Sequence, residues 1–219
     1  MNPTYDFYDK GDPWPVSAID QNPFYLREIK MIKSEVSKRI WGTALDLGAG
    51  YGRASLLLSH FAKRFILLDG SKKMLHKAKE LRPGSFCIAA SIDEGWPFDP
   101  NVFDLIVGMQ IANHARDLKD FFSKISKHLK KDGMAILSVG NINSVISWLE
   151  GLRTLGDHGF RRFSMNEVKA AAKRSELSCK VLGGSGLFSP YQKLKAFEKL
   201  NRWNFTAEYS HLVVVKLTK

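Results

Sequence analysis

The sequence predicts an α/β protein with a doubly wound, mostly parallel seven-stranded sheet and helices on both faces. Short, almost continuous apolar runs alternate with longer amphipathic segments, and such runs are typical of parallel strands that are buried on both sides. A length of 219 residues, of which 44% are hydrophobic, suits a single globular domain around one core. The expected strands are 44–47, 65–68, 86–89, 105–107, 135–139, 181–182 and 212–215.

The first helix is expected to begin at Asn22–Pro23, because Asn is preferred at a helix N-cap and Pro in the first turn. Apolar residues then recur at helical spacing, which predicts one buried face. The residues of that face are Phe24, Ile29, Ile32, Val36 and Ile40.

Five further helices or turns are expected from spacing and turn chemistry. Ser164 and Glu167 form the pattern of a capping box, which predicts a helix through about residue 175. Asp132–Gly133 is expected to make the turn into the fifth strand. The amphipathic segments between the first strands predict helices over 52–62, 71–81 and 117–130.

The chain is interpreted as one domain over residues 1–219, with two segments that flank a substrate. Residues 1–40 are expected to form an N-terminal arm and helix acting as a lid, and residues 141–163 a substrate-side insertion. The aromatic side chains of the arm either stack on a flat acceptor and shield a cation, or pin the arm to the core. They are Tyr5, Phe7, Tyr8, Trp14, Phe24 and Tyr25. In the insertion, the residues suited to a pocket wall with affinity for an anion are Trp148, His158, Arg161 and Arg162.

The charge is strongly positive, with 33 Lys and Arg against 22 Asp and Glu and a formal net charge of +11. Solvated helix surfaces account for much of this excess, while nucleic acid, an anionic membrane surface or an acidic small substrate are alternatives. No apolar run approaches the ~20 residues of a membrane-spanning helix, and the first residues lack the pattern of a secretory signal. Cys87 and Cys179 are isolated and have no metal or redox spacing, so we expect a cytoplasmic protein.

The densest functional signal is a glycine-rich loop over residues 45–53, Leu-Asp-Leu-Gly-Ala-Gly-Tyr-Gly-Arg, directly after the first strand. Glycines let a backbone turn tightly and let a ligand approach closely, and in a doubly wound sheet this loop lies at the ligand-binding edge. A dinucleotide fingerprint would require glycine at position 53, where this sequence has Arg53. This difference disfavours a nicotinamide oxidoreductase. The carboxylate of Asp46 suits a cofactor with a cationic amino-acid end.

Taken with three later segments, this loop resembles the first motif of the class I S-adenosylmethionine-dependent methyltransferases of the small-molecule type. Residues 67–71, Leu-Leu-Asp-Gly-Ser, are similar to the second-strand motif of that family. Residues 96–107 are similar to the stretch into its fourth strand, and residues 129–133 to its turn into strand five. The resemblance covers about residues 40–140 in the family's order and implies a Rossmann-like sheet that binds S-adenosylmethionine.

The resemblance implies which residues bind this cofactor. Asp69, followed by Gly70, would hold the ribose hydroxyls, whereas a helix-capping role is the alternative. Asp46 and Gln110 would lie at the methionine end. Many relatives have an acidic residue after the third strand that holds the adenine amino group. In this sequence Ile92 stands at that position, so Asp93, Ser91 or backbone groups would hold the amino group, and Ile92 would pack on the adenine ring. The full cofactor set is Asp46, Gly48, Ala49, Gly50, Asp69, Gly70, Ser91, Ile92, Asp93 and Gln110.

The expected reaction is methyl transfer to a small-molecule acceptor, with oxygen as the first choice of atom. A hydroxyl needs its proton removed as it attacks, and His114, at a position where a histidine recurs in the resembling enzymes, is the candidate base. The absence of an Asn/Asp-Pro-Pro-Tyr run disfavours amide nitrogen as the acceptor, and no residue cluster has metal-ligand spacing. Methylation of tRNA or rRNA and a non-catalytic cofactor-binding module are the alternatives, although the sequence contains no recognisable RNA-binding appendage.

Overall fold

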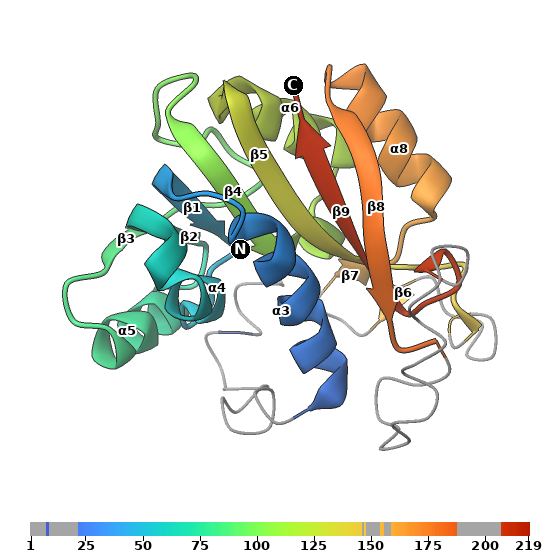
Figure 1. The fold of residues 1–219 in the computed structure, drawn as a ribbon, viewed down its shortest axis with the longest axis horizontal. Coiled ribbons are helices and arrows are strands. Elements are labelled where there is room, and N and C mark those ends of the chain that lie inside the picture. Colours follow the sequence, from blue (N-terminus) through green and yellow to red (C-terminus); the bar gives the residue numbers. More distant parts are fainter. Residues whose placement is uncertain (1–7, 9–21, 146, 148–153, 156–158, 188–206) are drawn as a thin grey trace.

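The computed structural model describes residues 8, 22–145, 147, 154–155, 159–187 and 207–219. Seven strands form one sheet in the order β3-β2-β1-β4-β5-β9-β8 (Figure 1). The first five are parallel, and β9 runs antiparallel to both β5 and β8. The strands are β1 (Trp41–Leu47), β2 (Ala62–Asp69), β3 (Phe86–Ala89), β4 (Phe103–Met109), β5 (Leu129–Gly140), β8 (Ser178–Ser185) and β9 (Leu212–Thr218). The predicted doubly wound, mostly parallel seven-stranded sheet is confirmed.

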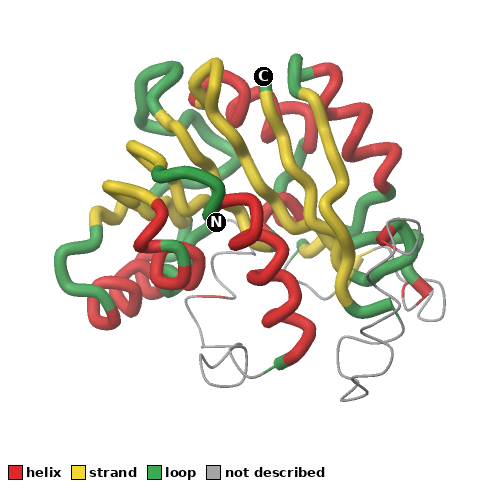
Figure 2. Tube along the Cα trace, viewed as in Figure 1, coloured by secondary structure: helices red, strands yellow, loops and turns green. Residues whose placement is uncertain are grey.

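Helices alternate with the strands along the chain and cover both faces of the sheet (Figure 2). One core cluster packs α6 (Leu118–His128) and α8 (Met165–Arg174) against one face. A second cluster packs α3 (Pro23–Val36), α4 (Arg53–Leu57) and α5 (Lys72–Leu81) against the other face. Neighbouring residues of a strand therefore enter opposite clusters, as Ala44 and Leu45 of β1 do, which explains why the strands are almost continuously apolar.

The N-terminal helix α3 begins as the sequence predicts. The Asn22 side chain accepts a hydrogen bond from the Phe24 amide at 3.0 Å, with Pro23 at the first helical position. Ile32 and Val36 are fully buried in the core, and α3 packs on β8 and β9. The expectation for Ile40 was wrong: the helix ends at Val36, so Ile40 lies beyond its face and is 62% exposed.

The expected helix over 52–62 is shorter and divided. Helix α4 ends at Leu57, a 3₁₀ turn, η1 (Ser59–Phe61), follows, and β2 already begins at Ala62. The apolar run of β2 starts only at Phe65, but its exposed first residues pair with β1, with Ala62 opposite Trp41 and Arg64 opposite Thr43. Backbone pairing thus extends the strand beyond its hydrophobic run.

The entry into β5 also differs from the expectation. Helix α6 ends at His128 and β5 starts at Leu129, so Asp132–Gly133 lies within the strand and is not a separate turn before it. Phe103 of β4 pairs with Leu129, whereas Leu105 pairs with Met134, and the register shifts between them. The intervening residues therefore form a bulged start of the strand.

The structure describes only part of the arm over residues 1–40 and of the insertion over residues 141–163, the two segments predicted to flank a substrate. β6 (Thr154–Leu155) and β7 (Phe160–Arg161) form a small antiparallel pair, and a second 3₁₀ turn, η2 (Ile111–His114), follows β4. The capping box of Ser164 and Glu167 opens α8 with both reciprocal hydrogen bonds present. Of the residues predicted to flank a substrate, Tyr5, Phe7, Trp14, Trp148 and His158 lie outside the described residues.

Candidate cofactor site at the carboxyl edge of the sheet

The glycine loop folds across the end of β2. The amides of Gly48 and Ala49 both donate to the Leu68 carbonyl, at 2.8 and 3.0 Å. Gly48 and Gly50 have φ angles of +66° and +53°, a left-handed conformation that is costly for a residue with a Cβ. Glycine is therefore required at these positions by the backbone itself.

Asp69, the last residue of β2, is fixed beside this loop. Its Oδ2 accepts a hydrogen bond from the Gly50 amide and its Oδ1 from the Ser71 amide, both at 2.8 Å. Each carboxylate oxygen can accept more than one hydrogen bond, so an oriented carboxylate can also accept from two neighbouring hydroxyl groups. The site thus fits a ribose, and Gly70 lies between Asp69 and Ser71 in the chain.

The glycine loop is in contact with the turn after β4. A Cβ built on Gly48 would lie 2.3 Å from Cδ1 and Cγ1 of Ile111, and one on Gly108 would lie 2.8 Å from Cγ2 of the same residue. Ile111 of η2 therefore fits between two glycines, one at the end of β1 and one in β4. The close approach joins the predicted cofactor loop to the segment that contains His114.

Asp46 is placed inside the protein. Its side chain is 2% exposed, and Oδ2 accepts a hydrogen bond from the Ser55 amide in α4 at 2.8 Å. Burial raises the pKa of Asp46 to about 7, with a smaller contribution from the negative charge of Asp69. The described contact is a structural one that fixes α4, and a role at the methionine end stays a prediction.

The residues predicted for the adenine side form a connected loop after β3. The Ser91 hydroxyl accepts from the Asp93 amide at 3.1 Å. The Asp93 carboxylate accepts from the Arg116 amide at 2.9 Å and lies 3.4 Å from Nε of Arg116. Ile92 is 3% exposed and belongs to the core cluster beneath α6. Asp93 therefore links this loop to the segment after η2.

Gln110 and His114 lie in the turn after β4. Gln110 has a φ angle of +60°, and its amide donates to the Ser138 hydroxyl at 2.8 Å and to the Ser138 carbonyl at 3.1 Å. Nε2 of His114 lies 3.4 Å from the Tyr8 hydroxyl. The ring of Phe160 meets the His114 ring edge-on at 5.3 Å, so aromatic rings surround the candidate base.

A buried acidic residue beside this turn was missed by the sequence analysis. Glu28 of α3 is fully buried; it accepts a hydrogen bond from the Ser138 hydroxyl, and its Oε2 lies 3.4 Å from Nη1 of Arg53. Burial raises the pKa of Glu28, while Arg53 and Ser138 oppose the shift. The signal in the sequence was its spacing, because Glu28 precedes Ile32 and Val36 by four and eight residues and so shares their stripe.

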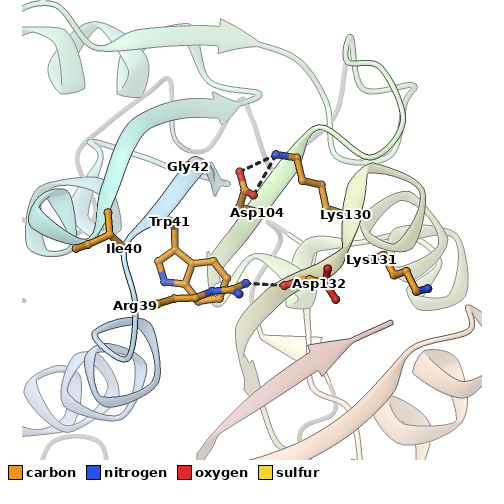
Figure 3. A pocket seen from close by; sticks show the side chains of 8 residues that line it. All are labelled: Arg39, Ile40, Trp41, Gly42, Asp104, Lys130, Lys131 and Asp132. Atoms are coloured by element: carbon orange, nitrogen blue, oxygen red, sulfur yellow. Dashed lines mark hydrogen bonds and ion pairs between the residues drawn. The ribbon is translucent and has the colours of Figure 1, made fainter.

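A hollow lies at the opposite edge of the sheet (Figure 3). Its volume is about 410 Å³, and it adjoins the first residues of β1, β4 and β5. Lys130 there bonds both oxygens of Asp104, and Arg39 stacks on Trp41 at 3.8 Å. Parallel sheets bind ligands at their carboxyl edge, so this hollow is separate from the candidate site.

In the described part of the chain, no group of three or more His, Cys, Asp or Glu residues is arranged to hold a metal ion. No helix within those same residues has the length and apolar character needed to cross a membrane.

Parts of the chain are similar in sequence to known proteins. Residues 45–137 match the family described as "Methyltransferase domain". A "Ubiquinone biosynthesis O-methyltransferase" of Pelagibacter ubique is 26% identical over 155 residues, covering 64% of this chain and 63% of that protein. The "Arginine-hydroxylase NDUFAF5, mitochondrial" of Danio rerio is 30% identical over 131 residues, covering 56% of this chain and 40% of that protein. The chain therefore spans less than two thirds of both relatives.

A solved structure extends the likeness to the whole fold. A Thermotoga maritima protein, described as an S-adenosylmethionine-dependent methyltransferase and possible histamine N-methyltransferase, superposes with a TM-score of 0.70. The match covers 99% of both chains at 16% identity. Residues 45–137, which include the glycine loop and Asp69, match a methyltransferase family, and the fold of the whole chain is that of solved S-adenosylmethionine-dependent methyltransferases.

Proposed function

We propose that this protein transfers the methyl group of S-adenosylmethionine to a small-molecule acceptor, with oxygen as the acceptor atom. The observation that carries the proposal is the Asp69 carboxylate, held by the Gly50 and Ser71 amides beside the glycine loop. A carboxylate oriented in this way at the carboxyl edge suits the two hydroxyls of a ribose.

The other cofactor contacts follow from the positions of the loops. Gly48, Ala49 and Gly50 would let the backbone approach the cofactor, while Gln110 would contact its methionine end. Ser91, Ile92 and Asp93 would line the adenine side, although Ile92 is already buried in the core. The cofactor supplies a methyl group on a positively charged sulfur, and the protein aligns the incoming acceptor with it.

His114 is proposed as the general base for an acceptor hydroxyl. Its Nε2 faces the Tyr8 hydroxyl, and Phe160 packs against the ring, so a flat acceptor would meet aromatic surfaces next to a nitrogen that can take its proton. The likeness to an O-methyltransferase of ubiquinone biosynthesis supports oxygen as the acceptor atom.

The acceptor is proposed to be anionic on account of Arg161. The carbonyl of Arg161 accepts a hydrogen bond from the side chain of Asn113, the neighbour of His114, and its guanidinium donates to the Arg116 carbonyl at 3.0 Å. Arg162 is only 2% exposed, so of the two arginines Arg161 is the one placed to meet a ligand. Unchanged affinity for an acidic acceptor in an Arg161→Ala variant would remove this part of the proposal.

The cofactor assignment is tested by calorimetric titration with S-adenosylmethionine, S-adenosylhomocysteine and NADH. We expect micromolar binding of the first two compounds, no binding of NADH, and much weaker binding in Asp69→Ala. Asp104→Ala is the matched control, because Asp104 also anchors a backbone amide but at the opposite edge of the sheet. Well-folded protein that binds neither sulfur compound would refute the proposal.

Product analysis separates the remaining functions. S-adenosylhomocysteine released with phenols, catechols or hydroxy acids would support an O-methyltransferase. Turnover on tRNA or rRNA that weakens steeply with salt would instead favour the RNA alternative suggested by the net charge of +11. Cofactor binding without turnover on any acceptor would favour a binding module.

A further inference from the structure

Glu28 is a carboxylate beside the candidate site that the proposed function does not use. Glu28 lies on α3, outside the segment that resembles the family, and its side chain is fully buried. A buried carboxylate is costly unless charges and hydrogen bonds compensate it. The partners of Glu28 therefore show what it organises.

The first partner is Ser138, near the end of β5. A serine hydroxyl has one proton to donate and lone pairs to accept with. The Ser138 hydroxyl donates its proton to Glu28, and it accepts the amide proton of Gln110 at 2.8 Å. The bonds thus run in one direction, from Gln110 through Ser138 to Glu28, and neighbouring bonds in such a chain polarise one another.

The residue at the start of this chain has a backbone that needs support. Gln110 adopts a φ angle of +60°, a conformation that is uncommon for a residue with a side chain and persists where surrounding structure holds it. It directly precedes η2, which contains Ile111 and His114. The position of the Gln110 turn therefore determines where Ile111 and His114 lie.

The second partner is Arg53, the last residue of the glycine-rich loop and the first residue of α4. Nη1 of Arg53 lies 3.4 Å from Oε2 of Glu28, and its side chain is only 12% exposed. The guanidinium also lies over the Tyr25 ring at 5.2 Å. Glu28 consequently contacts both the end of the cofactor loop and, through Ser138, the turn after β4.

We infer that Glu28 is a positioning residue for the methyl-transfer site: it fixes the Gln110 turn through Ser138 and the end of the glycine loop through Arg53. The inference rests on the proposed cofactor binding and adds a residue on α3 to it. The contacts described for Glu28 are with Ser138 and Arg53, so it acts through the two segments that these residues hold.

The first test examines the protein without cofactor. Amide hydrogen exchange at Gln110 is expected to be about tenfold faster in Ser138→Ala, which removes the hydroxyl that accepts from this amide beside the Ser138 carbonyl, and in Glu28→Gln, which removes the charge of the group that orients this hydroxyl. The matched control is Glu35→Gln, which removes another acidic residue of α3, one that pairs with Lys38 and Lys216 away from the site. Exchange at Gln110 should be unchanged in this control.

The second test measures S-adenosylmethionine affinity by calorimetry below the unfolding temperature. Glu28→Gln and Ser138→Ala are each expected to weaken binding about tenfold, and the double variant should bind no more weakly than either single one, because the residues act as a unit. Glu35→Gln should bind as the wild type does, even where its Tm is lower. A merely structural Glu28 would lower Tm while leaving the affinity of the folded protein unchanged.

The outcomes separate the inference from the proposed function. Wild-type affinity or wild-type Gln110 exchange in Glu28→Gln, or losses that multiply fully in the double variant, would overturn the positioning role alone. Wild-type protein that fails to bind S-adenosylmethionine would overturn the proposed function, and the positioning role with it.

Discussion

Replacing Gly48 by alanine is expected to destabilise the protein for two separable reasons. The φ angle of +66° imposes a left-handed backbone, which costs an L-residue with a Cβ about 1–2 kcal/mol. The new Cβ would also lie 2.3 Å from two carbons of Ile111, and overpacking of this kind costs about 1–3 kcal/mol more. The sum is about 2–5 kcal/mol, which corresponds to roughly 4–20 °C in Tm for a chain of this size.

Gly84→Ala is the matched control for the backbone contribution. Gly84 has a φ angle of +89°, but a Cβ added there would meet nothing within 4 Å. Its Tm should therefore fall by only about 2–8 °C, which is the left-handed penalty alone. The difference between the two variants measures the collision with Ile111.

A double-mutant cycle with Ile111→Gly tests the assignment of that collision. The Cβ of Ile111 would itself lie 2.7 Å from the new Cβ, so the whole side chain must be removed to give it room, and the interaction free energy between the two substitutions should then be about 1–3 kcal/mol in favour of the double variant. Thermal and urea unfolding of the four proteins provide the measurement. Equal losses in Gly48→Ala and Gly84→Ala, or additive effects in the cycle, would show that this reasoning is wrong.

Three further predictions concern pH and helix capping. The folded pKa of Asp46 is raised to about 7 from 3.8, so the folded state binds more protons than the unfolded state between pH 4 and 7. The stability that this protonated group confers at low pH is therefore lost as the pH rises through this window. Asp46→Asn should gain up to about 4 kcal/mol relative to the wild type from pH 4 to 7 in urea titrations, and a constant difference would contradict this. Burial beside Trp96 lowers the pKa of His128 below 6.5, so the unfolded state binds the proton first as the pH falls. The Tm of the wild type should therefore drop relative to that of His128→Phe below pH 6.5, and parallel curves of Tm against pH would exclude the effect. Ser164→Ala should cost about 1 kcal/mol, or roughly 2–4 °C in Tm by calorimetry, because it removes the capping box of α8; an unchanged Tm would show that the cap contributes nothing.

The order of strands and helices could be predicted from the sequence because it depends on local patterns. Apolar runs located all seven strands of the sheet, and the Asn22 cap and the Ser164 capping box are formed as their spacing indicated. The errors were at boundaries, where pairing between strands overrides the local pattern: β2 begins ahead of its hydrophobic run, and β5 includes Asp132–Gly133.

The candidate site was predictable where a motif is contiguous. The glycine loop and Asp69 are separated by about twenty residues, and the parallel pairing of β1 with β2 brings them together, so that Gly50 and Asp69 share a hydrogen bond. The environment of each side chain was not predictable in the same way. Asp46 belongs to the same motif, yet its carboxylate is turned inward to the Ser55 amide and is almost fully buried.

The sequence by itself determined the class of fold, the glycine positions and the acidic residue after the second strand, because turns, caps and strand patterns depend on residues that are neighbours in the chain. Only the tertiary structure decided which distant side chains share a buried space. Glu28 and Ser138 are 110 positions apart and meet because α3 packs across the sheet near the end of β5. Once both are removed from water, each polar group must find a partner within the protein, and which partner is within reach depends on how helices and strands pack.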